Sequence, residues 1–151
     1  YQSDTGMLMA RYPQPTAQAA YLDDSSPNLG AIYENVIAQE LTAQGIPLYY
    51  YMAKKHGEVD FIADTNADSV MPFEVKSGRS YRTHAAIDAV LANAEYRISQ
   101  GVVLSRSNIA QDGGTTYLPL YATYCLRDVC NLASPSTVST IGDFSLTVHP
   151  V

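Results

Sequence analysis

The sequence predicts an α/β domain in which α-helices flank a mixed β-sheet. One observation is the order of its segments, which reads as a helix, three strands, a helix and a strand. Another is that the strands are of two kinds. "EVDFIAD" and "VMPFEVKSG" are joined by the turn residues "TNADS" and predict an antiparallel hairpin, whereas the short apolar "GVVLSRS" is typical of a parallel strand inside a layered sheet.

The first helix is predicted to start near Ser26 and to end at Gly45. Ser26 can cap the helix, and Pro27 suits its first turn. Gly45, followed by Pro47, is a common helix end. Between these limits, apolar residues recur at helical spacing: Leu29, Ile32, Tyr33, Val36, Ile37 and Leu41.

Three strands follow, and we expect them to form the centre of the sheet. They are rich in aromatic and β-branched residues and are bounded by turn residues. Their predicted ranges are Pro47–Lys55, Glu58–Asp64 and Val70–Gly78.

The second half predicts a helix, a strand, and a strand followed by a short helix. The helix covers residues 84–98 and is capped by Ser80 or Thr83. The strands are Gly101–Ser107 and the first part of Thr115–Leu126. Residues 1–130 therefore predict one domain, and the Ser- and Thr-rich residues 131–151 form a tail of uncertain structure.

Composition and charge limit the functions open to this chain of 151 residues. It has 46% hydrophobic and 16% charged residues, and no apolar run approaches the ~20 residues that cross a membrane, so we expect a cytoplasmic protein. We expect the two cysteines, Cys125 and Cys130, to be reduced structural thiols. The formal charge of -6 opposes non-specific attraction to nucleic acid. Because the chain begins at Tyr1 rather than at Met, we expect it to be part of a longer protein.

Charged residues lie among the buried positions of the predicted hairpin. Residues two apart on a strand share a face, so Glu74 and Lys76 point the same way, and hairpin pairing can bring Asp60 beside Glu74. Two close carboxylates repel unless a hard divalent cation binds their oxygens. The pattern predicts a Mg²⁺ or Mn²⁺ site at Asp60 and Glu74, with the carbonyl of Val75 as a further ligand. The alternative is a paired ion cluster that only fixes strand register.

These residues carry a family resemblance. Asp60 followed by Glu74-x-Lys76 in "FEVKSG" resembles the signature of the PD-(D/E)xK, or restriction-endonuclease-like, nuclease superfamily. The helix "GAIYENVIAQELTAQG", followed by "YY", "GEVDF" and "FEVKSG", looks more closely like the uncharacterised C-terminal domain behind a AAA-type ATPase module in many bacteria and archaea. The opening "YQSDTGML" resembles the segment that precedes this helix in that family.

The resemblance implies a restriction-endonuclease-like fold, a metal-dependent nuclease site and an ATPase module in the same full-length chain. It assigns metal binding to Asp60 and Glu74, catalysis to Lys76, and the helical glutamate to Glu34, with Glu40 as an alternative on the same helix. Here "EV" rather than proline precedes the aspartate, a departure that is common in the superfamily.

Other residues predict how a nucleic acid would be held. The expected substrate is DNA, with RNA as the alternative, and the basic side chains near the motif are candidates for binding its phosphates: Lys54, Lys55, Arg79 and Arg82. The alternative for the two arginines is that they lie on a solvated face and bind no phosphate. We expect His56 to be a solvated loop residue. The 12 tyrosines favour packing over the stacking of bases.

Three functional hypotheses follow from the sequence. One is a metal-dependent DNA or RNA phosphodiesterase, and another is a non-catalytic module that keeps the nuclease scaffold and helps an ATPase to assemble or to bind a partner. The third is a purely structural domain, in which the charged residues form only a paired ion cluster. The sequence has no phosphate-binding Gly-rich loop ending in Lys-Ser or Lys-Thr, so we do not expect these residues to hydrolyse ATP.

Overall fold

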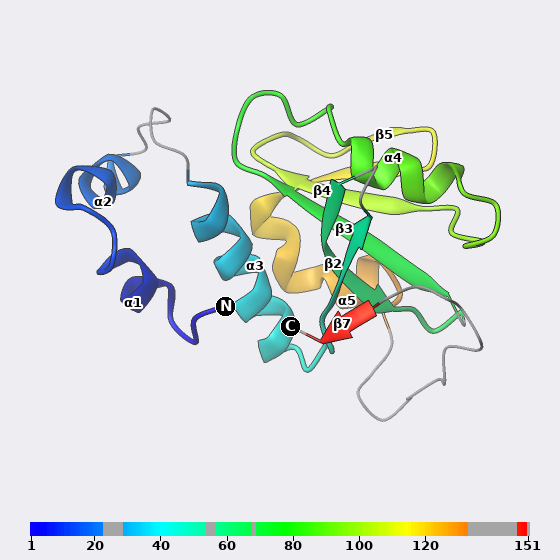
Figure 1. Ribbon diagram of the computed structural model, residues 1–151, viewed down its shortest axis with the longest axis horizontal. Coiled ribbons are helices and arrows are strands. Elements are labelled where there is room, and N and C mark those ends of the chain that lie inside the picture. Colours follow the sequence, from blue (N-terminus) through cyan, green and yellow to red (C-terminus); the bar gives the residue numbers. More distant parts are fainter. Residues whose placement is uncertain (23–28, 54–56, 68, 133–147, 151) are drawn as a thin grey trace.

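The computed structural model describes residues 1–22, 29–53, 57–67, 69–132 and 148–150 (Figure 1). Within these ranges, strands form one seven-stranded mixed sheet in the order β5-β6-β4-β3-β2-β1-β7. The strands are β1 (Tyr49–Ala53), β2 (Gly57–Asp64), β3 (Val70–Lys76), β4 (Gly101–Ser105), β5 (Ala110–Asp112), β6 (Thr115–Pro119) and β7 (Val148–Pro150). The predicted α/β class with helices packed on a mixed sheet is confirmed.

Strand pairing follows the predicted pattern around β3. β2 and β3 form the antiparallel hairpin, in a register that runs from Phe61 opposite Phe73 to Asp64 opposite Val70. β4 is parallel to both β3 and β6, as its apolar sequence predicts. The expectation that all three of the first strands are central is wrong for β1. Only β7 lies beyond β1, because β4, β6 and β5 all add on the other side of β3.

Helices cover both faces of the sheet. They are α1 (Thr5–Met9), α2 (Gln14–Tyr21), α3 (Gly30–Ala43), α4 (Ala85–Ala92), the 3₁₀ helix η1 (Leu120–Cys125) and α5 (Leu126–Val129). On one face, Leu41 of α3 and Leu126 of α5 pack in the same core as Phe73. On the other face, Val90 of α4 packs with Ile62. α3, α4 and α5 therefore bury their apolar sides against the sheet, which is the main source of stability in such layers.

The helix boundaries differ from the prediction at several points. α3 begins at Gly30 with Leu29 at its N-cap, and Ser26 and Pro27 lie outside the described residues. α3 ends as predicted, because Gly45 adopts the left-handed conformation, with φ of 69°. Neither Ser80 nor Thr83 caps α4.

The N-cap of α4 is His84, and the helix ends at Ala92 rather than near residue 98. The Asn93 side chain accepts a hydrogen bond from the Glu95 N–H at 3.0 Å, so it forms a local turn that competes with a further helical turn.

Other elements have no counterpart in the prediction. α1 packs on α3, α1 and α2 both lie on the side of α3 away from the sheet (Figure 1), and neither contains a buried residue. Asp4 caps α1 by accepting a hydrogen bond from the Met7 N–H at 2.8 Å. β5 extends one edge of the sheet, and β7, from the tail, pairs antiparallel with β1 at the other. No helix in the described part of the chain is long and apolar enough to span a bilayer.

Candidate functional site

A β-bulge changes the direction of the side chains in the part of β2 that carries Asp60. Tyr49 and Tyr51 of β1 lie opposite Ile62 and Val59 of β2, so two steps along β1 correspond to three along β2. The extra residue lets both Val59 and Ile62 join the apolar cluster beneath α4. Asp60 therefore departs from the simple alternation of the strand, as residues in bulges near functional sites commonly do.

The Asp60 carboxylate bonds directly to the backbone of the neighbouring strand. Its Oδ2 accepts a hydrogen bond from the Val75 N–H at 2.7 Å, next to the last paired residues, Phe61 and Phe73. The N–H and C=O of one strand residue point toward the same neighbouring strand. The Val75 carbonyl is thus directed to the side on which Asp60 lies.

Glu74 is a buried carboxylate with one oxygen paired and one unpaired. The residue is 7% exposed, and its Oε1 forms an ion pair with the Lys76 ammonium. Its Oε2 is buried without a hydrogen-bond partner in the described structure. An unpaired buried carboxylate oxygen carries a desolvation cost that a positive ligand would offset.

Glu34 of α3 contributes a further negative charge. Burial raises the pKa of Asp60 to about 7; the Val75 hydrogen bond opposes this, and the charges of Glu34 and Glu74 add to it. The pKa of Glu34 is itself raised by burial and by Glu58, against the lowering effect of Lys76. We call Glu34, Asp60, Glu74 and Lys76 the Asp60 cluster. Motif spacing favours Glu34 over Glu40 as the helical glutamate, and the charge of Glu34 contributes to the raised pKa of Asp60.

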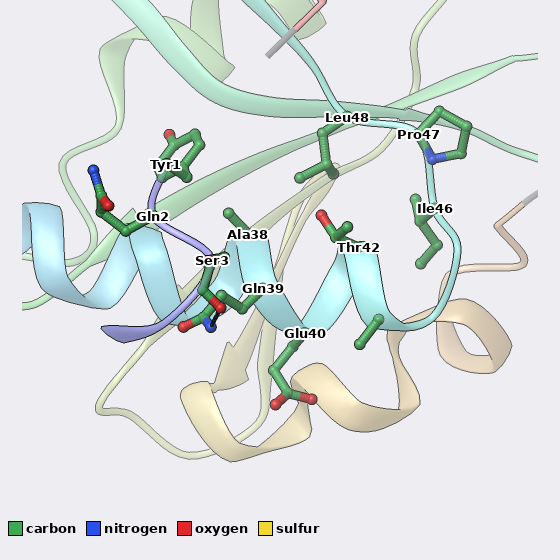
Figure 2. Close-up of a pocket in the computed structure, with 11 residues that line it drawn as sticks. Tyr1, Gln2, Ser3, Ala38, Gln39, Glu40, Thr42, Ile46, Pro47 and Leu48 are labelled. Carbon is green, nitrogen blue, oxygen red and sulfur yellow. Dashed lines mark hydrogen bonds between the residues drawn. The ribbon is translucent and has the colours of Figure 1, made fainter. Parts of the chain in front are cut away.

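Glu40 instead lines a groove along the C-terminal half of α3. The groove has a volume of about 760 Å³ and lies between α3, residues 46–48 and the first three residues of the chain. In Figure 2, Glu40 projects away from Tyr1, on the opposite side of α3. It is therefore a natural control for Glu34.

The donors of the Asp60 cluster suit a hard divalent cation. Asp60 and Glu74 supply carboxylate oxygens and Val75 a carbonyl oxygen, which are ligands that Mg²⁺ and Mn²⁺ accept. Among the described residues, no three His, Cys, Asp or Glu side chains converge on a metal-sized site. An ion would therefore be held by two carboxylates with backbone and water oxygens. The unpaired Glu74 Oε2 and the raised pKa of Asp60 fit such an ion.

The predicted nucleic-acid contacts are only partly described. Lys54, Lys55 and His56 lie outside the described residues. Arg79 is exposed. The Arg82 guanidinium lies over the rings of Tyr81 and Tyr117, 5.7 and 5.2 Å from their centroids, and 3.8 Å from Asp112. It already has aromatic and acidic neighbours.

Sequence reasoning missed an N-terminal strap, which we define as residues 1–5, bound along α3. The Gln2 N–H donates to Asn35 Oδ1 at 2.6 Å, and Gln39 Nε2 donates to the Ser3 carbonyl at 2.6 Å. Asn35 is 1% exposed and also donates to Thr5 Oγ1 at 3.1 Å. The available signal was a polar residue, Asn35, on the apolar side of a helix, because a buried amide requires partners.

A second polar cluster lies on the α4 side of the sheet, and we call His84, Tyr117 and Asp88 the His84 cluster. His84 is 6% exposed, and its Nε2 lies 2.7 Å from the Tyr117 hydroxyl in a buried hydrogen bond. Its Nδ1 lies 2.9 Å from the Asp88 carboxylate, although the two do not have hydrogen-bond geometry.

The two cysteines are free thiols. Cys130 is buried, and burial together with Cys125 raises its pKa to about 12. A thiol with so high a pKa is a poor nucleophile, in keeping with a structural role.

Residues 29–123, which carry the whole Asp60 cluster, match the family described as a domain of unknown function, DUF4143. The chain belongs to the DUF4143 family. Neither a curated protein nor a solved structure matches it.

Proposed function

We propose that this DUF4143 domain is a divalent-metal-dependent phosphodiesterase of the nuclease type that acts on DNA. The observation that supports it most is the Glu74 carboxylate, which is buried with Oε2 unpaired beside an Asp60 carboxylate tied to the Val75 N–H. The order of Asp60, Glu74 and Lys76 along the chain, similar to that in PD-(D/E)xK nucleases, supports the same chemistry.

Asp60 and Glu74 would hold the ion, with the Val75 carbonyl as a third protein ligand. A bound Mg²⁺ or Mn²⁺ supplies polarisation of the phosphodiester and a lowered pKa for water. Asp60 must lose its proton to act as a ligand. Since its pKa is raised to about 7, it does so near neutral pH.

Lys76 and Glu34 have roles that need no direct metal contact. The Lys76 side chain is 32% exposed, so its ammonium reaches the surface while Glu74 fixes its position. There it stabilises the negative charge that develops on the phosphate. Glu34, half-buried with a raised pKa, accepts a hydrogen bond from the attacking water and orients it.

The second candidate is a non-catalytic scaffold that serves an ATPase module in the full-length protein. The formal charge of -6 favours the scaffold, because an acidic domain repels a polyanion such as DNA unless cations or a partner offset its charge. The resemblance to the domain behind AAA-type ATPases supports such a module under either function. We place the protein in the cytoplasm, where free thiols stay reduced.

A cleavage assay distinguishes the two functions. The chain is incubated with Mn²⁺ and with supercoiled, single-stranded and branched DNA and RNA, beside Glu74→Gln and the control Glu40→Gln. Cleavage that disappears in Glu74→Gln but persists in Glu40→Gln supports the nuclease. Equal cleavage by all three proteins would identify a contaminant, and no cleavage with intact metal binding would favour the scaffold.

A further inference from the structure

The N-terminal strap fixes the position of Tyr1 beside the Asp60 cluster. Asn35 holds the strap at Gln2 and Thr5, and Gln39 holds the Ser3 carbonyl between them. These contacts come from two successive turns of α3 on one side of the helix. They limit the freedom of the neighbouring Tyr1, so its side chain has a defined place.

The Tyr1 ring lies against the bulge of β2. Its centroid is 5.4 Å from that of Phe61, which directly follows Asp60. The side chain is drawn at one end of the groove in Figure 2, with the hydroxyl turned away from Leu48. The residue is 56% exposed, so one side of the phenol packs on the protein while a ligand can reach the other.

The charges around the Tyr1 hydroxyl are those of the candidate metal site. Burial raises its pKa, and Glu34, Asp60 and Glu58 raise it further in that order. A phenol hydroxyl has an ordinary pKa of about 10, so it is protonated at neutral pH and can donate a hydrogen bond. No hydrogen bond from this hydroxyl to another described residue is present.

A phosphate oxygen is the acceptor that this arrangement suits best. A free anion is repelled by Glu34 and Asp60, but a phosphate bound beside a divalent cation is not, because the cation offsets the carboxylate charge. A neutral donor at the rim then adds an oriented hydrogen bond without adding charge.

We propose that Tyr1 is a substrate-binding residue whose hydroxyl donates a hydrogen bond to a phosphate oxygen of a nucleotide held beside Asp60 and Glu74. This inference rests on the proposed function of that site. Asn35 is then a positioning residue, because it acts on the substrate only through the strap.

The test compares wild type, Tyr1→Phe and the control Tyr21→Phe in the full chain. Tyr21 is 90% exposed and lies in α2, so its loss controls for the removal of a phenol hydroxyl as such. Mn²⁺ affinity is measured first, by paramagnetic resonance of the free ion. Affinity for thymidine 5′-monophosphate, a product-like probe, is then measured calorimetrically at saturating Mn²⁺.

We expect Tyr1→Phe to weaken nucleotide binding about tenfold, the size of one lost hydrogen bond to a charged group, and to leave Mn²⁺ affinity within about twofold. Tyr21→Phe should match wild type in both. Equal nucleotide affinity in Tyr1→Phe and wild type overturns the inference and leaves the metal site standing, as does a wild type that binds Mn²⁺ but no nucleotide. Loss of Mn²⁺ binding in Tyr1→Phe also overturns it, because Tyr1 would then support the metal site itself. Failure of wild type to bind Mn²⁺ overturns the proposed function and this inference together.

Discussion

The Asp60 cluster and the His84 cluster are both polar groups within the fold, but they satisfy their polar atoms differently. In the His84 cluster, one short hydrogen bond joins two side chains that are each nearly buried, and His84 Nδ1, which has no hydrogen-bond partner, lies 2.9 Å from the exposed carboxylate of Asp88. In the Asp60 cluster, the charges of Glu34 and Glu74 help to raise the pKa of Asp60, and one buried oxygen of Glu74 has no hydrogen-bond partner. Stability explains the first arrangement, whereas the second costs free energy in the absence of a cation.

Removal of His84 should have the largest effect on folding. His84→Ala leaves a cavity and an unpaired buried Tyr117 hydroxyl, so we expect the free energy of unfolding to fall by about 2–4 kcal/mol. Urea melts measure it. Asp88→Asn is the control and should change stability by less than about 0.5 kcal/mol, because Asp88 is exposed. If His84→Ala lost less than about 0.5 kcal/mol, the His84 cluster would not be a source of stability, and the contrast with the Asp60 cluster would fail.

Replacement of Asp60 should act in the opposite direction. The amide of Asp60→Asn can still accept the Val75 hydrogen bond but carries no charge, so in EDTA at pH 8 we expect a gain in stability of up to about 1–2 kcal/mol. If Asp60 belonged to a structural ion pair, the change would instead cost about 3–5 kcal/mol. Lys76 pairs with Glu74 rather than with Asp60, which favours the gain.

A divalent cation should stabilise only the protein that retains the site. At tenfold excess over its dissociation constant, Mg²⁺ should raise the free energy of unfolding of wild type by about 1.4 kcal/mol. Asp60→Asn and Glu74→Gln should gain much less, and Glu40→Gln as much as wild type. A gain that survives the double change Asp60→Ala, Glu74→Ala would place the ion elsewhere.

The pH dependence of the metal-free protein sharpens the same contrast. Because the folded-state pKa of Asp60 is raised from 3.8 to about 7, the folded state holds this proton more tightly than the unfolded state does. The contribution is fully present below about pH 4 and is lost as pH rises through about 7, so stability should fall over that window. The advantage of Asp60→Asn over wild type should vanish near pH 4. An advantage that persists there would mean that charge is not its cause.

The smallest expected effect concerns the exposed arginines. Arg82 already lies over Tyr81 and Tyr117, so Arg82→Ala should shift weak DNA binding only slightly, whereas Arg79→Ala should reduce it more. Gel shifts at physiological salt with Mg²⁺ test this order. Tight DNA binding without a divalent cation would contradict the weak affinity expected from the net charge.

Local patterns explain what the sequence could predict. The β2–β3 hairpin follows from alternation and turn residues, and the pairing of Glu74 with Lys76 follows from their two-residue spacing. The contact between Asp60 and Val75 depends instead on the bulge against β1, which no residue of β2 reveals by itself. The N-terminal strap was missed for the same reason, because Gln2 and Asn35 are 33 positions apart. Glu34 is preferred to Glu40 by the spacing of the motif alone, and that preference remains a prediction.

The bulge in β2 has a consequence for how this domain can change over generations. The bulge depends on the number of residues in the strand rather than on the identity of their side chains. In a regular strand one residue separates two that share a face, whereas here two residues separate Val59 and Ile62, which reach the same apolar cluster. A codon substitution at Asp60 leaves that spacing intact, whereas deletion of the codon turns apolar side chains to the wrong face. Under the proposed function, a substitution at Asp60 would remove the chemistry without changing the spacing that the fold requires, so related domains could keep the same shape with or without the activity.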